Sequence, residues 1–465
     1  MHFAVFLIVL NIFKICLARY LPLIGDEAFY WLWSKHLDLS YVDHPPMIAY
    51  YIKGLTLLFG NTELAIRLGA ILLVTLTTWL VYKIGQELFS QQAGIISAVI
   101  FNLLPIFFGG SLFLVPQQPF LFYWALSLYL FCRLIKTSQP WLWLALGTTV
   151  GLGLLSDYVM LLFFPAVGLY LILNKEQRFW LSKLQPYAAA LLALAIFSPV
   201  IIWNLKQGFV PLFYWSGKMG GTPNYLQNLL SFIALETALY TPIVFGAVFY
   251  LLWQLRKFDP RTTLLAAFSL PVLLVFLALA PLMTVGGHWP AAAYLPAVLL
   301  LGQLSGKTRT WLVGLTLFFA LLLNSLALGY YLFFFPTPPE LIGQEFTINQ
   351  KLPEFIKNAT PKNGYTFYLA NNLGLAGLVA FHGHVTVQMA PGRLRQFDLW
   401  GKPALKNGDN ALYFALNEKE VYDQLILLFQ QVTKDPQKRI FTKDAEIPSK
   451  TEIYHCFGYK GGELP

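Results

Sequence analysis

The stretch Glu63-Leu-Ala-Ile-Arg-Leu-Gly-Ala-Ile-Leu-Leu-Val-Thr-Leu-Thr-Thr-Trp-Leu-Val-Tyr-Lys83 decides the fold class of this chain. It has no charged residue between Arg67 and Lys83, and it is as long as the roughly 20 apolar residues that a helix needs to cross a bilayer core. The 465-residue chain has the same character throughout, with 57% hydrophobic and 12% charged residues. Soluble domains usually carry about 25% charged residues. The composition therefore excludes a soluble enzyme, a disordered chain and a fibrous repeat, and it predicts an α-helical polytopic membrane protein.

Ten further stretches resemble the first, so we expect about eleven transmembrane helices. The eleven stretches cover residues 2–20, 63–83, 92–109, 113–132, 141–156, 158–173, 186–204, 235–254, 262–283, 289–304 and 310–335. The first stretch lacks the basic start and the small-residue cleavage site of a signal peptide, so we expect it to remain as a span.

The basic residues predict the orientation, because cytoplasmic loops of membrane proteins carry an excess of Lys and Arg. With the N-terminus in the cytoplasm, the inner loops hold Lys83, Arg133, Lys136, Lys175, Arg178, Lys183, Arg256, Lys257, Arg261, Lys307 and Arg309. The outer loops 105–118, 156–158 and 284–288 hold no Lys or Arg. The net charge of +9 thus requires no nucleic-acid partner, and an odd number of spans places the C-terminal region outside the inner (plasma) membrane.

The C-terminal tail has a different composition. The Pro-rich stretch Pro336-Thr-Pro-Pro339 suggests a boundary between a transmembrane domain over 1–335 and an extracytoplasmic domain over 336–465. Strand-like runs at 365–370, 385–390 and 411–415 alternate with helical runs at 372–381 and 418–429, which predicts a small soluble α/β domain. The three cysteines do not form a disulfide framework.

The first long outer loop carries the candidate chemistry. It contains Leu23-Ile-Gly-Asp-Glu-Ala-Phe-Tyr-Trp-Leu-Trp-Ser-Lys-His36 and Tyr41-Val-Asp-His-Pro-Pro-Met-Ile-Ala-Tyr-Tyr-Ile-Lys53. Both pieces are typical of short amphipathic helices whose aromatic residues lie in the headgroup region. We expect Asp26 at an N-cap and the two prolines after Asp43 in a first helical turn.

The acidic residues of this loop have two interpretations. Aspartates cap helices in most proteins, and a capping role for Asp26 needs no catalysis. Ionisable groups near a membrane, however, usually pair or act in function, and Asp26, Glu27, Asp43 and His44 are expected at the mouth of a helical bundle.

Three runs make the sequence similar to a known family. These runs are Gly25-Asp-Glu-Ala-Phe-Tyr-Trp-Leu-Trp-Ser34, Tyr41-Val-Asp-His-Pro-Pro-Met-Ile-Ala-Tyr50 and Leu58-Phe-Gly-Asn-Thr-Glu-Leu-Ala-Ile-Arg-Leu68. They resemble the N-terminal signature of the family-39 membrane glycosyltransferases, which include protein O-mannosyltransferases and lipid A aminoarabinose transferases. The resemblance extends more weakly to about residue 335. It implies the C-type glycosyltransferase fold, an extracytoplasmic site and a polyprenyl-phosphate sugar donor.

The resemblance places the family's catalytic aspartate at Asp26. A polyprenyl phosphate is a good leaving group, so one carboxylate that deprotonates an acceptor hydroxyl suffices, and the reaction should invert the anomeric centre. Hydrolases that expel an alkoxide need two carboxyl groups instead. Asp26 is therefore the predicted general base, with Glu27 as a predicted substrate contact.

A second group of residues has two alternative roles, in metal binding or in contact with the donor phosphate. In the aminoarabinose transferases the pair matching Asp43-His44 is Glu-Lys, with its carboxylate near a metal. Asp43, with His288 as a second ligand, therefore predicts a divalent metal ion as an optional cofactor, although an Asp-His dipeptide is a weak metal signal. His44 either completes this ligand pair or faces the donor phosphate. His288 alternatively contacts a phosphate or lies at the interface beside Trp289.

Four further residues are predicted to bind substrate. Gln117 stands where relatives often have an aspartate, and it can hydrogen-bond a sugar hydroxyl but cannot act as a base. Asp157 either coordinates sugar hydroxyls or is a plain turn residue. Arg67 and Lys218 are candidate phosphate contacts, and for each the alternative is a long basic side chain that only reaches the interface.

The sequence leaves two other functions open. A lipid or glycan transporter or flippase should show repeated halves and charges at the bilayer midplane, and the sequence shows no internal repeat. A structural membrane subunit that recruits a partner through its tail is the third possibility. For the transferase, the predicted partners are membrane lipids, a polyprenyl-phosphate-linked sugar, and a glycolipid, glycan or protein acceptor.

Overall fold

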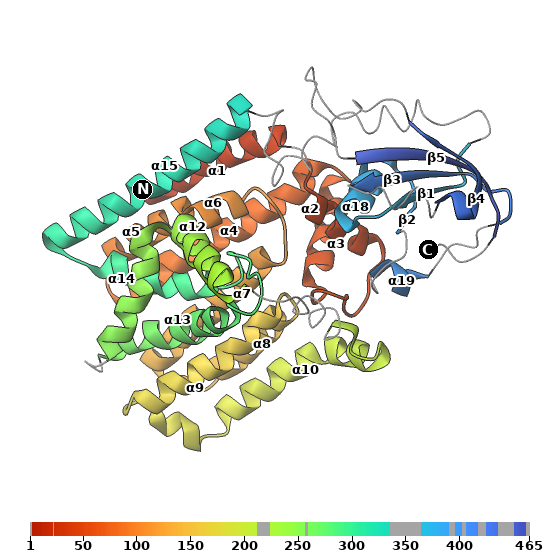
Figure 1. Cartoon of the computed structure of the whole chain (residues 1–465). Helices are drawn as coiled ribbons and strands as arrows, with labels where there is room; N and C mark the ends of the chain where they lie inside the picture. The colour runs from red at the N-terminus through yellow and green to blue at the C-terminus, as the bar shows by residue number, and fades with distance from the viewer. Residues whose placement is uncertain are drawn as a thin grey trace. The chain divides into compact units, whose positions relative to one another are not determined.

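The computed structural model describes residues 2–21, 23–211, 224–255, 259–334, 364–389, 396–401, 406–416, 425–435 and 451–461 (Figure 1). Seven helices within these ranges are long and apolar enough to cross a membrane. Shorter apolar helices occupy four other expected spans, at Gln91–Leu103, Leu142–Leu154, Tyr158–Leu173 and Ala291–Gln303. The polytopic helical fold is confirmed, and the count of eleven spans stays a prediction.

The elements follow one another mostly as helices. The helical elements are α1 (His2–Tyr20), α2 (Gly25–Lys35), α3 (Met47–Phe59), α4 (Glu63–Leu88), α5 (Gln91–Leu103), α6 (Pro105–Gly110), α7 (Gln117–Thr137), α8 (Leu142–Leu154), η1 (Tyr158–Leu162), α9 (Phe163–Leu173), η2 (Arg178–Ser182), α10 (Gln185–Lys206), α12 (Tyr225–Gln254), α13 (Pro260–Leu279), η4 (Ala291–Ala293), α14 (Tyr294–Gln303), α15 (Gly306–Phe334), α18 (Leu373–Gly383) and α19 (Gln396–Trp400). The strands are β1 (Phe367–Ala370), β2 (Val387–Met389), β3 (Ala411–Leu416), β4 (Phe429–Lys434) and β5 (Thr451–Tyr459).

The chain forms two compact units. Unit 1 comprises Met1–Ile15, Leu39–Ile48 and Arg67–Ala327, and unit 2 comprises Cys16–Asp38, Ala49–Ile66 and Leu328–Pro465. Unit 2 thus joins the segment that holds Asp26 to the C-terminal sheet. The predicted boundary between residues 335 and 336 lies outside the described residues and stays a prediction.

Small residues allow helices of unit 1 to pack closely. A Cβ atom on Gly147 of α8 would lie 2.5 Å from the carbonyl oxygen of Ala189 of α10, and one on Gly151 would lie 2.7 Å from Cβ of Ile196. Membrane helices are held together by such close van der Waals packing, because lipid supplies no hydrophobic drive between them. The two glycines therefore set the distance between α8 and α10.

A buried lysine anchors α1 to the helices of unit 1. Most of α1 is exposed, yet Lys14 is 1% exposed and its ammonium donates a hydrogen bond to Oδ1 of Asn102. Asn102 in turn donates to Oγ1 of Thr78 at 2.7 Å. A charged group within a membrane span is costly unless it is paired, so this chain of polar contacts fixes the rotation of α1.

Asn102→Leu should lower the free energy of unfolding by about 1–3 kcal/mol, because it leaves Lys14 buried without this acceptor. Lys14→Met in the same chain should restore most of the loss, since removal of both polar partners is nearly neutral. Thermal unfolding of the purified protein in detergent measures both effects. A double variant as unstable as Asn102→Leu alone would show that the pair does not anchor α1.

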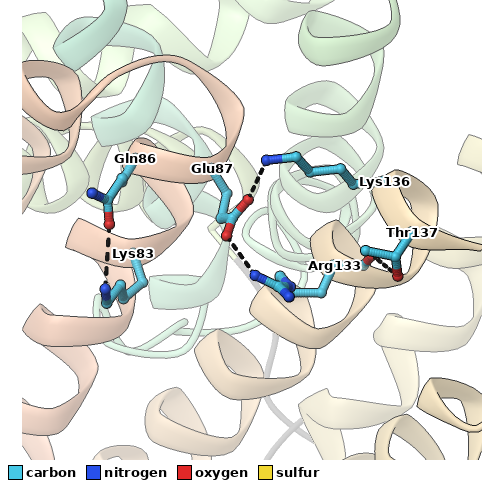
Figure 2. A network of polar contacts seen from close by, with 6 residues as sticks. All are labelled: Lys83, Gln86, Glu87, Arg133, Lys136 and Thr137. Carbon is cyan, nitrogen blue, oxygen red and sulfur yellow. Dashed lines mark hydrogen bonds and ion pairs between the residues drawn. The ribbon is translucent and has the colours of Figure 1, made fainter. Parts of the chain in front are cut away.

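An acidic residue and two basic residues from two expected inner loops meet at the C-terminal ends of α4 and α7 (Figure 2). Glu87 accepts from Arg133 at 2.9 Å and from Lys136 at 2.7 Å. Gln117 is at the opposite end of α7, about 24 Å along the helix from Arg133 and about 28 Å from Lys136 at 1.5 Å per residue. The residues predicted on opposite sides of the membrane thus lie at opposite ends of the same helix, while the orientation itself stays a prediction.

Unit 2 contains a five-stranded sheet in the order β2-β1-β3-β5-β4. β1 pairs in parallel with β2 and β3, whereas β5 pairs antiparallel with β3 and β4. The helix α18 connects β1 to β2, which forms a parallel βαβ unit. Alternate residues of the strands, including Phe367, Leu369 and Tyr413, share one buried core.

The tail prediction is partly confirmed. The strand-like runs at 365–370, 385–390 and 411–415 correspond to β1, β2 and β3, and the helical run at 372–381 corresponds to α18. The helix expected over 418–429 falls partly on residues outside the described ranges, and Phe429 begins the strand β4 rather than ending a helix. β4 and β5 were not predicted.

The segment predicted as the first long outer loop differs from its prediction in three ways. Ile24 is the N-cap of α2, so Asp26 lies within the first helical turn instead of at the cap. The helix α3 begins at Met47, after the two prolines. The aromatic residues of α2 are buried in protein, with Trp31 at 7% and Trp33 at 0% exposed, because α18 and neighbouring aromatic rings cover them; they do not form an exposed belt.

Candidate functional site

A partly open pocket of about 240 Å³ lies in unit 1, slightly below the range of roughly 300–1,000 Å³ that is typical of ligand sites. Its lining residues are Asp43, His44, Gln117, Asp157, Tyr158, Val159, Phe276 and Trp289. Carboxylates and an amide can bind hydroxyl groups, while aromatic rings supply flat apolar walls. The pocket therefore combines groups that suit a polyhydroxylated ligand.

Backbone hydrogen bonds bring the two acidic parts of the pocket together. The N–H of Met47 donates to the carbonyl of Leu155 at 2.9 Å, and the N–H of Tyr41 donates to the carbonyl of His44 at 3.2 Å. The first bond ties the segment after Asp43 to the end of α8, two residues before Asp157. Segments more than a hundred residues apart thus meet at the pocket.

Asp157 has both of the roles that its sequence position allows. It is the N-cap of η1, where its carboxylate accepts the N–H of Val159 at 2.9 Å, and it lines the pocket beside Gln117, whose amide donates to it at 3.4 Å. Burial raises the pKa of Asp157 to about 6, because desolvation outweighs the hydrogen bond from Val159. Asp157 therefore titrates close to neutral pH.

A buried chain of side chains supports the loop that carries Trp289. Tyr240 donates to the carbonyl of Gly287 at 2.9 Å and stacks on Tyr294 with ring centroids 3.5 Å apart. Tyr294 donates to Oε2 of Glu236 at 2.6 Å. α12 is kinked at this point, with Thr241 at φ 64° before Pro242. The kinked helix thus fixes the loop at one wall of the pocket.

The pocket gathers four of the predicted site residues, namely Asp43, His44, Gln117 and Asp157. Arg67 is fully buried with its guanidinium 5.8 Å from the ring centroid of Phe113, and His288 is exposed. Lys218 lies outside the described residues. Among the described residues that line the pocket, His44 is the one that can carry a positive charge.

Asp26 and Glu27 belong to unit 2 and differ in exposure. Glu27 is fully buried, and its carboxylate accepts the N–H of Ile24 at 3.3 Å, as a structural cap does. Asp26 is exposed, and within α2 only Asp26 and Lys35 are exposed. The role of each residue in substrate binding or catalysis stays a prediction.

Among the described residues, no group of three or more His, Cys, Asp or Glu side chains is arranged to hold an ion, which is the number of protein ligands that a zinc site needs. Asp43 and His44 are the two candidate donors that line the pocket, and a magnesium ion can be held by one or two carboxylates together with substrate phosphates. The divalent ion stays a prediction, and no step of the reaction is assigned to it.

Five residues of the site were not found by sequence reasoning. Four line the pocket, namely Tyr158, Val159, Phe276 and Trp289, and Glu236 supports its wall. A single acid within an apolar span is a recognisable signal, since such residues are usually functional or paired. The aromatic residues gave no comparable signal, because aromatic side chains are frequent throughout the chain.

Comparison with known proteins supports the resemblance to membrane glycosyltransferases. Residues 43–203 match the family described as dolichyl-phosphate-mannose-protein mannosyltransferase. The chain is 27% identical over 284 residues to the lipid A galacturonosyltransferase RgtD of Rhizobium johnstonii, covering 59% of each protein. It is 28% identical over 194 residues to the undecaprenyl phosphate-alpha-4-amino-4-deoxy-L-arabinose arabinosyl transferase of Erwinia tasmaniensis, covering 40% of this chain and 35% of that protein. The chain thus aligns with about three fifths of the first relative and about a third of the second.

Solved structures show the same fold. ArnT from Cupriavidus metallidurans, bound to undecaprenyl phosphate, superposes with a TM-score of 0.69 at 12% identity over 97% of both chains. The archaeal oligosaccharyltransferase AglB from Archaeoglobus fulgidus superposes with a TM-score of 0.51 at 10% identity, over 82% of this chain and 64% of that chain. The C-type glycosyltransferase fold implied by the sequence is therefore confirmed.

Proposed function

We propose that this protein is an inverting glycosyltransferase that moves a monosaccharide from a polyprenyl-phosphate carrier to an acceptor at the outer face of the inner membrane. The observation that carries the proposal is the pocket of unit 1, in which Asp43, His44, Gln117 and Asp157 meet. All four residues lie within the stretch that matches the mannosyltransferase family. Two relatives are named as glycosyltransferases that act on lipid A or use an undecaprenyl phosphate-linked sugar.

In the proposed reaction the acceptor oxygen attacks the anomeric carbon of the donor sugar. The bond between that carbon and the phosphate oxygen breaks, and polyprenyl phosphate leaves with its electron pair. Asp26 accepts the proton of the acceptor group as a general base, which is typically worth about 10²–10⁴-fold. Attack from the face opposite the phosphate inverts the anomeric centre.

The pocket residues have binding roles in this proposal. The carboxylates of Asp43 and Asp157 and the amide of Gln117 accept or donate hydrogen bonds to sugar hydroxyls. His44 interacts with the donor phosphate when its imidazole is protonated. Trp289 and Phe276 contact the apolar faces of the sugar or the start of the carrier chain. Arg67 and Lys218 stay proposed phosphate contacts.

We propose lipid A or a similar glycolipid as the acceptor, because one relative is named as a lipid A glycosyltransferase. Mass spectrometry of envelope lipids and glycans from cells with and without the gene tests this proposal. A single sugar should disappear from a glycolipid on deletion and return with the wild-type gene. If lipid A is unchanged and a sugar is lost from protein or polysaccharide instead, the proposed acceptor is wrong. The proposed transferase activity would still stand.

Tyr240→Phe should weaken donor binding without loss of the fold. The change removes the hydrogen bond to Gly287 that supports the loop of Trp289, and one such bond is worth about 0.5–1.5 kcal/mol, or about 2- to 12-fold in the KM for the donor. Steady-state kinetics in proteoliposomes measures the effect, with Tyr250→Phe in the same helix as the control. An unchanged KM would show that this support is not needed.

A further inference from the structure

The C-terminal helix α18 lies directly against the first turn of α2, within unit 2 (Figure 1). A Cβ atom on Gly374 would lie 2.9 Å from Cα of Gly25, and one on Gly377 would lie 2.6 Å from both the carbonyl carbon of Ala28 and the nitrogen of Phe29. These contacts are with main-chain atoms, which cannot rotate away. The two glycines therefore bracket the main chain on either side of Asp26.

Aromatic contacts extend this interface along α2. Trp31 meets Phe381 of α18 edge-on, with ring centroids 5.0 Å apart, and Phe29 stacks on Phe397 at 6.2 Å. His36, just after α2, stacks on Trp400 at 4.6 Å. The C-terminal region thus contacts α2 from its first turn to its end.

Polar contacts fix the same helices to the segment before α4. Asn61 accepts from Nε1 of Trp31 at 3.1 Å and from Nζ of Lys35 at 2.8 Å. His382 of α18 also approaches Glu63, the first residue of α4, at 3.5 Å, but its Nε2 atom forms no hydrogen bond with a described residue. Three stretches of chain, far apart in sequence, therefore hold one short helix.

The helix α2 needs such support. It has 11 residues, and isolated helices shorter than about 12–15 residues are marginal in water. Only Asp26 and Lys35 of α2 are exposed. A shift or rotation of α2 would therefore change the position and exposure of the Asp26 carboxylate.

We propose that α18 positions the first turn of α2 through Gly374 and Gly377, so that the C-terminal α/β region sets the placement of Asp26 and is a required part of the transferase. This inference rests on the proposed function, in which Asp26 is the general base. Gly374 and Gly377 are positioning residues, because they contact the helix that carries Asp26 and not the substrate.

The test compares Gly377→Ala with Gly54→Ala in the full-length protein. Gly54 also lies in a helix of unit 2, but a Cβ there meets nothing within 4 Å. The assay uses proteoliposomes with lipid A and undecaprenyl phosphate-linked aminoarabinose or galacturonic acid, whichever the wild type turns over. Gly377→Ala should lower kcat by about 10- to 100-fold, since small misplacements of a catalytic group cost this much, with little change in the donor KM. Gly54→Ala should match the wild type.

The combination with Asp26→Asn separates positioning from general damage. If Gly377 acts through Asp26, Gly377→Ala should cause no further loss in the Asp26→Asn background, because residues that act as a unit are not additive. The same fold-loss in both backgrounds, or a wild-type kcat for Gly377→Ala, would overturn the inference while the transferase proposal stands. A wild-type kcat for Asp26→Asn would instead remove the proposed base, and the inference with it.

A second variant covers the case in which Gly377→Ala does not fold. Phe381→Leu removes the edge-on contact with Trp31 but keeps an apolar side chain at that position. It should lower kcat by a smaller factor, again only when Asp26 is present. Equal kcat for Phe381→Leu and wild type, with the protein folded by size-exclusion chromatography, would contradict the proposal.

Discussion

Asp26→Asn should lower the kcat of sugar transfer by about 10²–10⁴-fold, because it removes the general base that accepts the acceptor proton. The side chain is exposed in the first turn of α2, and the amide is nearly the same size, so the fold should be unaffected. Thermal unfolding and binding of undecaprenyl phosphate should therefore match the wild type. Transfer is measured in proteoliposomes by mass spectrometry of the glycosylated acceptor.

Asp38→Asn is the matched control for this change. Asp38 follows α2 in the same segment of unit 2, and the substitution removes one carboxylate of the same type. It should leave kcat close to that of the wild type. Equal losses in the two variants would point to a general effect of loop charge, and undiminished transfer by Asp26→Asn would show that another group is the base.

Asp157→Asn should remove the acidic limb of the pH profile for transfer. Burial raises the pKa of Asp157 to about 6, so the wild-type carboxylate is ionised above that pH and becomes neutral as pH falls through it. If the ionised form binds a sugar hydroxyl, a bond worth about 1.5–3 kcal/mol, the variant should lose about 10- to 100-fold in kcat/KM at pH 7.5. Its remaining activity should change little between pH 5 and 7.5.

The same variant should be more stable than the wild type at neutral pH. Folding raises the pKa of Asp157 from 3.8 to about 6, so protonation of this carboxyl favours the native state. The resulting gain in the free energy of unfolding is present below about pH 4 and is lost as the pH rises through about 6. A shift of this size corresponds to up to about 3 kcal/mol, and Asn can still cap η1. Asp157→Asn should therefore unfold at a higher temperature than the wild type at pH 7.5 and at a similar temperature near pH 4.

Lower activity together with higher stability of Asp157→Asn at pH 7.5 would identify Asp157 as a functional group of the pocket. A loss of stability at pH 7.5 together with full activity would instead leave only its role as a cap of η1. An acidic limb that persists in Asp157→Asn would assign the titration near pH 6 to another residue.

The sequence predicted the helical membrane fold because apolar stretches of this length occur mainly in chains that cross a bilayer. It also predicted that Asp43, His44, Gln117 and Asp157 belong to one site, since the expected topology places all their loops on the same side of the membrane. In the structure these four residues line one pocket. Their predicted roles still await experiment.

Tertiary contacts account for what the sequence did not reveal. Trp31 and Trp33 have the composition of a membrane-interface belt, but the aromatic side chain of Phe381 on α18 covers Trp31, and such packing has no local signal. The strands β4 and β5 were missed because their pairing joins residues such as Val432 and Cys456 across a segment without a clear pattern. Ile24 is the N-cap of α2, and the buried Glu27 stabilises the start of the helix by accepting the N–H of Ile24, which is a different contact from the N-cap contact expected of Asp26.

The most direct test of the central claim supplies the purified wild-type protein, in proteoliposomes, with lipid A and an undecaprenyl phosphate-linked sugar. Free undecaprenyl phosphate and glycosylated lipid A should appear in equal amounts, and NMR should show that the new glycosidic bond has the opposite anomeric configuration to the donor. Movement of intact donor across the bilayer without release of undecaprenyl phosphate would contradict the account and identify a transporter. A product that retains the donor configuration would contradict direct displacement with Asp26 as the base.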